Sequence, residues 1–391
     1  MHHGGLLPRE LLLLALSFTL IAPATVAAQQ QSSPQCDCFL TSDPTGNKPT
    51  FFTHHYFIDF RNASGPFPAP PNITAADTSG TEALTSSYFT TPTWSSFWSI
   101  NNATGLYNFS SSSHTPQVAS AGNVFIASGD GDNDGDDDSS SRNNGTFLAL
   151  RTSRNRAFQS VAELTSRETD MQHLSVRARL RVLASNDSAG QQSVVETGAV
   201  FGLFTYQSDT QESDLEILTD DDSSTVHCSN QPDYDAKKDR PVEGASSEVA
   251  MPDGVKWTAW NTQRLDWLDG VSRWWVEGVN VLNKTVNVPK KPSAVVLNLW
   301  SDGGDWSGNM TVGRQARVGI EWIEVAYNVS RDSGRGSCKV GCWIDGDQVK
   351  DVGAPVLAFN STMEGAAASR RVVASDLLAG LVGVVLLFSL L

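Results

Sequence analysis

Short apolar runs, separated by Gly, Pro, Asn, Asp and Ser, recur along the chain from about residue 50. In 174–183, Leu174, Val176 and Leu180 alternate with Arg177 and Arg179, which is the period of a β-strand with one buried face. We find no amphipathic helix longer than two turns and no internal repeat. The pattern predicts strands at 51–60, 123–127, 147–152, 174–183, 199–206, 212–219, 260–267, 273–277, 294–300 and 318–327. Many short strands with long connections predict an all-β sandwich or barrel.

The two ends of the chain have the composition of processing signals. An apolar run at 11–22 follows Arg9 and precedes small residues, which predicts a signal peptide over 1–28 with cleavage after Ala28. The apolar tail 377–391 is shorter than the about 20 residues of a membrane span. Small residues at 365–368 and a polar spacer precede it, which predicts glycolipid (GPI) attachment near Gly365 and removal of 369–391. A plain C-terminal membrane helix is the alternative.

Between these ends we expect an extended segment at 29–48, a folded domain at 49–344 and a linker at 345–368. The formal net charge of −15 argues against nucleic acid as a partner, since phosphate binding needs clustered cations. The eleven Trp suit either a β-core or a site where sugar rings stack. Ten Asn-x-Ser/Thr motifs favour an extracellular glycoprotein, at Asn62, Asn72, Asn102, Asn108, Asn144, Asn186, Asn283, Asn309, Asn328 and Asn360.

Cysteine usage favours disulfides over metal binding. Cys36 and Cys38 precede the domain and Cys338 and Cys342 end it, so we expect the two pairs to bridge each other, in either pairing. Cys228 is left over, and we expect it to be a buried thiol.

Metal and cofactor motifs are weak. The stretch from Asp130 to Asp138 begins like a calcium loop, but Ser141 stands where a bidentate Glu is needed, so a solvated acidic loop is the alternative. His54 and His55 lack the further ligands of a zinc site. We expect no cofactor and no metal, and find no P-loop or dinucleotide fingerprint.

The segment 211–218 carries three acids at alternate positions. In a strand, Glu212, Asp214 and Glu216 share a face, while Ser213 points into the opposite layer, where its hydroxyl needs an acceptor. Three carboxylates in a row repel one another, and no Lys or Arg occurs between Arg181 and Lys237 to neutralise them. A solvent-exposed acidic face is one reading.

Glycoside hydrolysis is the other reading of the three acids, because it needs one carboxylate to attack and one carboxylic acid to protonate the leaving oxygen. The Cα atoms of Glu212 and Glu216 are about 13 Å apart in a strand, and inward-leaning side chains bring the carboxyls near the roughly 5–5.5 Å of a retaining enzyme. The charge of Asp214 between them keeps a proton on one neighbour and can hold the nucleophile in place.

The run Glu-Ser-Asp-Leu-Glu at 212–216 resembles the E-x-D-x-E signature of glycoside hydrolase family 16, the laminarinase and lichenase group. The runs 257–267, 273–278 and 292–300 are similar, in order, to the strands that follow the catalytic strand of that family, and Gly-Gly-Asp-Trp follows at 303–306. The resemblance covers about residues 50–330 and looks most like cell-surface fungal members. Ser213 and Gln211 depart from the usual aliphatic residue and Gly, which puts the subfamily in doubt.

The resemblance implies a concanavalin A-like β-jelly-roll sandwich of two antiparallel sheets. It also implies that Glu212 is the nucleophile, Asp214 the assisting acid and Glu216 the general acid/base. Asn298, Trp300 and Trp306 are candidates for sugar subsites, with core packing as the alternative. His227 either hydrogen-bonds sugar or is a surface His. For Trp94, Phe97 and Trp98 we expect packing.

We therefore expect a secreted, monomeric, GPI-anchored enzyme of the cell surface or wall that cleaves β-1,3- or β-1,3/1,4-glucan with retention. A transglycosylase using the same site, a lectin-like binding protein and a structural wall protein are the alternatives. The shortage of nearby cations predicts raised carboxyl pKa values and an acidic pH optimum.

Overall fold

The computed structural model describes residues 35–42, 50–77, 79–102, 114–129, 145–184, 194–332 and 338–361. The chain divides into two units, and all described residues belong to the unit Pro34–Leu391. The expected signal peptide, the stretch from Asp130 to Asp138 and the expected anchor region near Gly365 lie outside the described residues.

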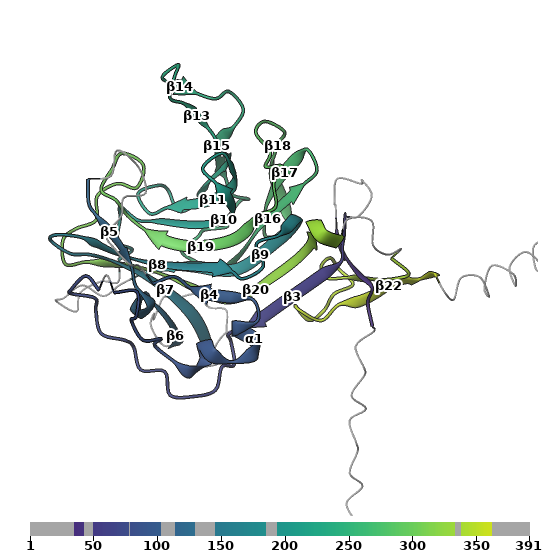
Figure 1. Ribbon diagram of the computed structural model, residues 1–391, viewed down its shortest axis with the longest axis horizontal. Helices are drawn as coiled ribbons and strands as arrows, with labels where there is room; N and C mark the ends of the chain where they lie inside the picture. The colour runs from purple at the N-terminus through teal and green to yellow at the C-terminus, as the bar shows by residue number, and fades with distance from the viewer. Residues whose placement is uncertain are drawn as a thin grey trace, which may run out of the picture. The chain divides into compact units, whose positions relative to one another are not determined.

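One antiparallel sheet, here called the front sheet, contains the acidic strand (Figure 1). Its order begins at β15 and ends at β8, with β4 beside β8. In that order its strands are β15 (Ser246–Ala250), β12 (Thr225–Asn230), β11 (Gln211–Leu218), β10 (Val200–Ser208), β19 (Ala294–Trp300), β8 (Gln159–Ser166) and β4 (Trp98–Ile100).

The second antiparallel sheet, here called the back sheet, runs from β6 to β18, with β3 beside β20. Its strands are β6 (Val124–Ser128), β7 (Thr146–Arg154), β20 (Gln315–Val329), β9 (Met171–Leu183), β16 (Asn261–Leu268), β17 (Val271–Val276), β18 (Val279–Lys284) and β3 (His54–Asp59). Pairing of β7 with β8 joins the two sheets, and β5 (Gln117–Ala119) runs parallel to β8.

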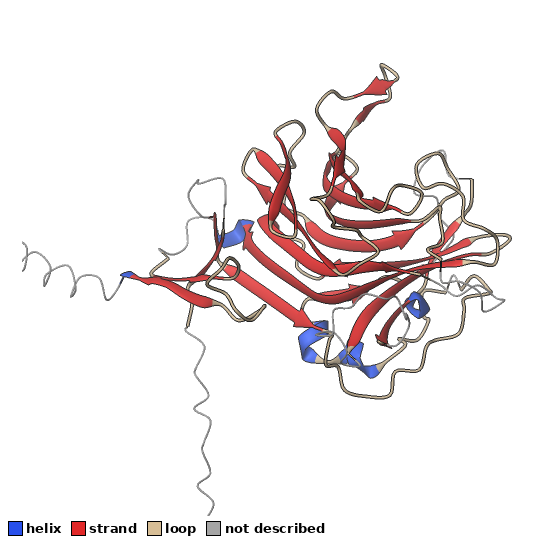
Figure 2. Cartoon of the chain, turned by 180° about the vertical axis from the view of Figure 1, so that it is seen from behind, coloured by secondary structure: helices blue, strands red, loops and turns tan. Residues whose placement is uncertain are grey.

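Helices are short and few among the described residues, as Figure 2 shows in blue. They are η1 (Ser87–Thr90), α1 (Pro92–Ser95), η2 (Ala121–Asn123) and η3 (Ser330–Asp332). A small hairpin of β13 (Tyr234–Asp235) and β14 (Arg240–Pro241) follows β12. The prediction of an all-β sandwich of two antiparallel sheets is confirmed.

The hydrophobic core lies between the two sheets and takes side chains from both. On β9, Leu174, Val176 and Leu180 are fully buried, as their alternation predicts. On its other face Arg177 donates to Glu324 at 2.7 Å. Trp94, Phe97 and Trp98 are also buried in the core, which confirms the packing interpretation.

A separate four-stranded sheet joins the two ends of the described chain. Its order is β2 (Thr50–Phe52), β1 (Cys38–Thr41), β21 (Val340–Trp343) and β22 (Val356–Asn360). Disulfides Cys36–Cys342 and Cys38–Cys338 cross-link it, so the two cysteine pairs do bridge each other. Closing a covalent loop of about 300 residues lowers the entropy of the unfolded chain, which stabilises the fold by about 6 kcal/mol in the chain-entropy treatment.

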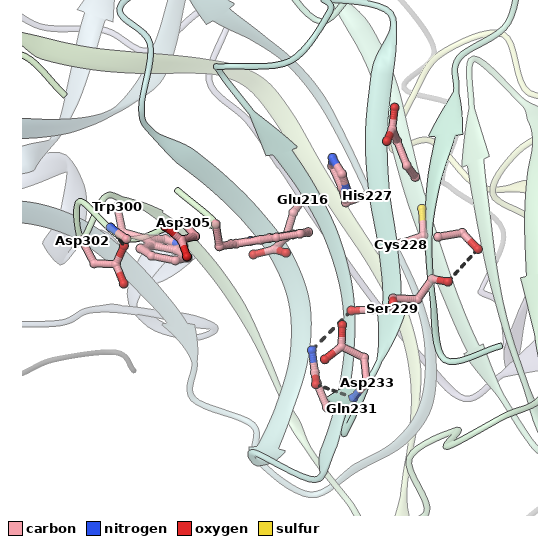
Figure 3. Close-up of a pocket in the computed structure, with 14 residues that line it drawn as sticks. Glu216, His227, Cys228, Ser229, Gln231, Asp233, Trp300, Asp302 and Asp305 are labelled. Atoms are coloured by element: carbon pink, nitrogen blue, oxygen red, sulfur yellow. Dashed lines mark hydrogen bonds between the residues drawn. The ribbon is translucent and has the colours of Figure 1, made fainter. Parts of the chain in front are cut away.

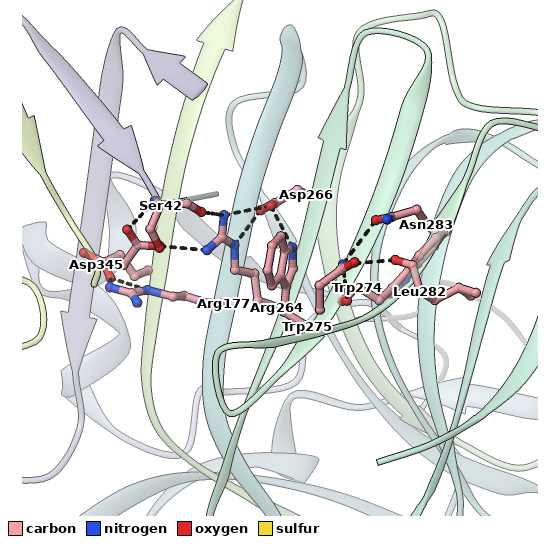
Figure 4. A network of polar contacts seen from close by, with 11 residues as sticks. Ser42, Arg177, Arg264, Asp266, Trp274, Trp275, Leu282, Asn283 and Asp345 are labelled. Atoms are coloured by element: carbon pink, nitrogen blue, oxygen red, sulfur yellow. Dashed lines mark hydrogen bonds and ion pairs between the residues drawn. The ribbon is translucent and has the colours of Figure 1, made fainter. Parts of the chain in front are cut away.

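The linker expected from residue 345 differs from the structure. Residues 356–360 form β22, which belongs to the small sheet because it pairs with β21. Asp345 is buried and accepts from Arg264 at 2.7 Å, and the same guanidinium donates to Asp266 and lies over the ring of Trp275 (Figure 4). These contacts come from strands far away in the sequence, so local composition did not reveal them.

Candidate active site

Strand β11 presents its three acids on one face and its apolar side chains on the other. Leu215 and Ile217 are fully buried in the core. Glu212, Asp214 and Glu216 occupy the alternate positions, so they share the opposite face of the front sheet. The expected arrangement of the acids is therefore present.

Ser213 faces the core and is fully buried, as predicted. Its hydroxyl donates to the side-chain oxygen of Asn230 and lies 2.8 Å from the hydroxyl of Ser272, which belongs to the back sheet. A buried hydroxyl without an acceptor is unfavourable, and these contacts explain how this chain tolerates Ser at a position facing the core.

Asp214 is the most enclosed of the three acids, with 4% of its surface exposed. Its Oδ2 accepts from the hydroxyl of Ser229 at 2.7 Å and from the amide of Gln231 at 3.1 Å. No described group donates a hydrogen bond to its Oδ1. The Glu212 carboxyl is close to Asp214, and each of these two carboxyls changes the pKa of the other.

Burial is the largest cause that raises the pKa of all three carboxyls. For Asp214 the pKa rises only to about 6, because the neighbouring Glu212 carboxyl and the hydrogen bonds from Ser229 and Gln231 lower it. Burial and then the charge of Asp214 raise the pKa of Glu212 far above its usual range. The Glu212–Asp214 pair therefore holds one proton at neutral pH.

The pKa of Glu216 rises to about 8, first through burial and then through repulsion by Asp214. The neighbouring Trp306 side chain acts in the opposite direction and lowers this pKa. Glu216 is therefore largely protonated at neutral pH, as a general acid must be. The sequence interpretation attributed raised pKa values to the shortage of cations; in the structure, burial contributes more than charge.

A cleft of about 550 Å³ opens over the front sheet beside Glu216. Its lining comes from β11, β12 and β15 and from the loop that follows β19, so it extends across the strands. Figure 3 shows Trp300, Asp302 and Asp305 on one side of Glu216 and His227, Cys228 and Ser229 on the other. The lining residues are Glu216, His227, Cys228, Ser229, Gln231, Asp233, Ser246, Ser247, Glu248, Trp300, Asp302, Gly304, Asp305 and Trp306.

Three of the four predicted sugar-binding residues line this cleft, namely His227, Trp300 and Trp306. His227 pairs with Glu216 across β11 and β12 and forms a 2.6 Å hydrogen bond with Asp221. The ring of Trp306 meets the His227 imidazole edge to face, with centroids 4.9 Å apart. The structure thus brings these residues to the acids, and their roles in sugar binding stay predictions.

Asn298 of β19 is the fourth predicted sugar-binding residue. Gly202 of β10 pairs with Glu216 on one side and with Asn298 on the other, so Asn298 lies on the same face of the sheet as the acids. Its side-chain oxygen is buried without a hydrogen-bond partner among the described residues. A Cβ on Gly202 would lie 2.7 Å from that oxygen, so only glycine leaves room for it. An unpaired buried acceptor on this face is suited to a hydroxyl donor from a bound sugar.

Sequence reasoning missed Glu163 of β8, which pairs with Asn298 and extends the same row across the front sheet. Asn101 donates to its carboxylate, and burial raises its pKa. The sequence did contain a signal for this residue, because Glu163 is the single acid within the apolar run 161–164. An isolated carboxyl in such a strand has to face away from the core.

Other groups add little to the site. Cys228 is a free, fully buried thiol, as expected. In the part of the chain that the structure describes, no cluster of three or more His, Cys, Asp or Glu could hold a metal. Within the same residues, no helix is long and apolar enough to span a membrane.

Comparisons with known proteins find partial similarity to β-glucanases. No profile of a protein family matches the chain. A curated β-glucanase of Paenibacillus macerans is 30% identical over 70 residues, which are 17% of this chain and 30% of that protein. The chain therefore spans less than a third of the length of the curated relatives it matches.

Two β-glucanases are among the solved structures that are similar to this chain. The β-glucanase of Bacillus licheniformis has 19% identity over 59% of this chain and 92% of its own, with a TM-score of 0.42. A prokaryotic β-1,3-1,4-glucanase (lichenase) from a mouse hindgut metagenome has 15% identity over 70% of this chain and 99% of its own, with a TM-score of 0.44.

Proposed function

We propose that this chain is a glycoside hydrolase of family 16, a retaining endo-β-glucanase that cleaves β-1,3- or β-1,3/1,4-glucan. The single observation that carries the proposal is the row of Glu212, Asp214 and Glu216 on one face of β11, beside a cleft. Burying three carboxyls so close together is unfavourable for stability. Glycoside hydrolysis gives a functional reason for the arrangement, because it needs one carboxylate to attack and one carboxylic acid to protonate the leaving oxygen. The partial similarity to β-glucanases supports the substrate class.

In this mechanism the Glu212 carboxylate attacks the anomeric carbon while the glycosidic C–O bond breaks. Glu216 donates its proton to the leaving oxygen, and a glycosyl ester forms on Glu212. Glu216, now ionised, takes a proton from the incoming hydroxyl, whose oxygen attacks the same carbon and releases Glu212. Water as acceptor gives hydrolysis, and a second glycan gives transfer.

Asp214 has a supporting role in the first step. The reactive form of the Glu212–Asp214 pair keeps its one proton on Asp214, so that Glu212 is ionised. Oδ2 already accepts two hydrogen bonds, so Oδ1 is the oxygen on which that proton sits. From there it donates to the nucleophile and holds its orientation.

The lining of the cleft favours an uncharged glycan. Five of its residues are carboxylic acids, and the lining set contains no Lys or Arg. Sulfated or uronic sugars would meet like charge there. The indole rings of Trp300 and Trp306 offer flat apolar surfaces on which a sugar can stack.

The test is release of reducing ends from laminarin and lichenan by the native protein and by Glu212→Gln. We expect the variant to lose at least about a thousandfold in activity while still binding the glycan. Glu243→Gln, which changes an exposed acid outside the cleft lining, is the matched control and should remain active. A native protein that binds these glucans and cleaves none would refute the proposal in favour of a lectin. Mass spectrometry with an added oligosaccharide acceptor separates hydrolysis from transfer.

We also propose that the protein is exported and held at the cell surface by a glycolipid. The apolar run at 11–22, the apolar tail at 377–391, the Asn-x-Ser/Thr motifs and the two disulfides support this address. Release of the protein from cells by phosphoinositide-specific phospholipase C is the expected result. Protein that stays in the detergent phase after this treatment would instead indicate a membrane helix.

A further inference from the structure

Strand β18 is the last strand of the back sheet and forms a hairpin with β17 (Figure 1). Among the described strands it pairs with β17 alone, so its other edge has no neighbouring strand in that part of the chain. It is six residues long, and a free edge of this length can pair with a strand of another molecule. A protein that stays apart from its own copies has to protect such an edge.

Charge does not protect β18. Its one charged side chain, Lys284, is buried and points into the fold, where it donates to the Gly244 carbonyl at 3.0 Å. Glu277, in the turn before the strand, hydrogen-bonds back to β16. Val279 is 50% exposed on β18, whereas β15, the end strand of the front sheet, carries the exposed acid Glu248. The free edge of β18 therefore lacks the charged residue that commonly prevents pairing.

Asn283 is exposed on this strand and begins the Asn-x-Thr motif at 283–285 (Figure 4). Its side-chain oxygen accepts from the amide of Asn280 at 3.1 Å, and its amide nitrogen makes no hydrogen bond with the described residues. In Asn328, which begins another such motif, both the amide oxygen and the amide nitrogen bond to backbone groups. The side chain of Asn283 is therefore held by its oxygen, while the nitrogen that would carry a sugar is unused.

We propose that Asn283 carries an N-linked glycan and that this glycan shields the free edge of β18 from other copies of the chain. The inference rests on the proposed export, because the sugar donor is an oligosaccharide carried on a lipid diphosphate in the secretory pathway. The bond between Nδ2 and the sugar C1 forms while the bond between C1 and the phosphate oxygen breaks. The diphosphate leaves with the electron pair, and Nδ2 gives up one proton.

The product is a bulky, hydrated group on the end strand of the sheet. A strand of a second copy would have to lie about 4.8 Å from β18, with its side chains beside that of Asn283. The glycan occupies this approach. It therefore does for β18 what an exposed charge does for other edge strands.

The first experiment is mass spectrometry of glycopeptides from the full chain made in cells that attach N-linked glycans, and we expect a glycan at Asn283. Asn62, exposed in the turn after β3, serves as the reference motif. A glycan at Asn62 with an unmodified Asn283 would overturn the inference and leave the export proposal intact. A chain that stays in the cytosol with no glycan at any motif would refute the export proposal and the inference with it.

The second experiment compares self-association by sedimentation velocity at rising protein concentration. Thr285→Ala removes the motif and Thr285→Ser keeps it; Thr285 is exposed and forms no side-chain hydrogen bond with the described residues, so both variants should fold. We expect only Thr285→Ala to shift from monomers to dimers and larger species. Ser64→Ala, which removes the glycan of Asn62 away from any sheet end, is the matched control and should behave like the native protein. No more association in Thr285→Ala than in Thr285→Ser would overturn the shielding role.

A second substitution tests whether the association uses β18. Val279→Lys, added to Thr285→Ala, places an exposed charge on the same strand and should restore the monomer. Association that persists in this double variant would show that another surface is responsible and would overturn the assignment to β18. Neither experiment uses a glucan, so a failure of the proposed hydrolase activity leaves these outcomes unchanged.

Discussion

Trp274 of the back sheet donates its indole N–H to the backbone carbonyl of Asp214, in the acidic strand of the front sheet, at 2.8 Å. Both residues are buried. This hydrogen bond crosses the sandwich and reaches the strand at the middle of its three acids. The position of the candidate active site therefore depends on the core beneath it as well as on the neighbouring strands.

Replacement of Trp274 by Phe should lower both stability and activity. It removes one hydrogen bond to the Asp214 carbonyl, whose residue also pairs with Ser229 in the ladder between β11 and β12, and this costs about 1 kcal/mol. Trp267→Phe is the matched control, because Trp267 is equally buried and donates its indole N–H at 2.8 Å to the Pro289 carbonyl rather than to the acidic strand. Thermal unfolding should shift similarly in the two variants, and only Trp274→Phe should lose kcat/KM. Equal loss of activity in both would contradict the expected link.

The pH–rate profile should be bell-shaped with its maximum near neutrality. On the acid side the Glu212–Asp214 pair must lose one of its two protons, and the lower pKa of the pair, that of Asp214, is about 6. On the alkaline side Glu216 must keep its proton, and its pKa is about 8. The structure therefore predicts a higher optimum than the acidic one expected from the sequence. Initial rates on lichenan between pH 4 and 10 test this, and a maximum below pH 5 would contradict it.

Glu216→Gln should stabilise the fold in a pH-dependent way. Because the folded-state pKa of Glu216 is raised to about 8, folding is favoured with the carboxyl protonated, and the native protein loses stability as the pH rises from about 4.3, the unfolded value, through 8. Gln carries no such penalty. The melting temperature of the variant should equal that of the native protein at pH 4 and exceed it by several degrees at pH 8.

Glu243→Gln serves as the control for this stability measurement, because Glu243 is exposed. It should show no difference at either pH. A Glu216→Gln protein that is less stable than the native protein at pH 8 would mean that the carboxylate is stabilised by its surroundings, contrary to the raised pKa.

Substrate charge should matter. Because the cleft lining has five acids and contains no Lys or Arg, carboxymethylated lichenan should be cleaved about tenfold more slowly than the uncharged polymer at low salt. At 0.5 M salt the two rates should approach each other, since salt screens the repulsion. Glu248→Gln, which removes one exposed acid of the cleft, should narrow the gap at low salt. A gap of the same size at both salt concentrations would point to steric exclusion.

Most of the correct predictions came from the local alternation of apolar and polar residues along single strands. In 212–217 a period of two was enough to place Glu212, Asp214 and Glu216 on one face and Leu215 and Ile217 on the other, because the strand geometry alone decides this. The same rule identified β9, in which one face is apolar throughout.

Long-range contacts decide the features that could not be predicted. Glu163 joins the row of Asn298 and Glu216 only because β8 pairs with β19, and 135 residues separate the paired positions 163 and 298. The fold of residues 345–360 depends on the contact between Asp345 and Arg264 and on the pairing of β22 with β21. Burial raises the carboxyl pKa values more than neighbouring charge does, and this burial depends on the residues that surround the acids in the folded chain. None of these partners is visible in a local stretch of sequence.

The two disulfides determine how a mechanical load passes through the molecule. Cys36–Cys342 and Cys38–Cys338 join segments separated by 306 and 300 positions, and the sandwich is the loop of chain that they enclose. When the chain is pulled at its two ends, the force crosses these covalent bonds within the small sheet and bypasses β11. The cleft can then keep its geometry while the two ends of the chain are under tension.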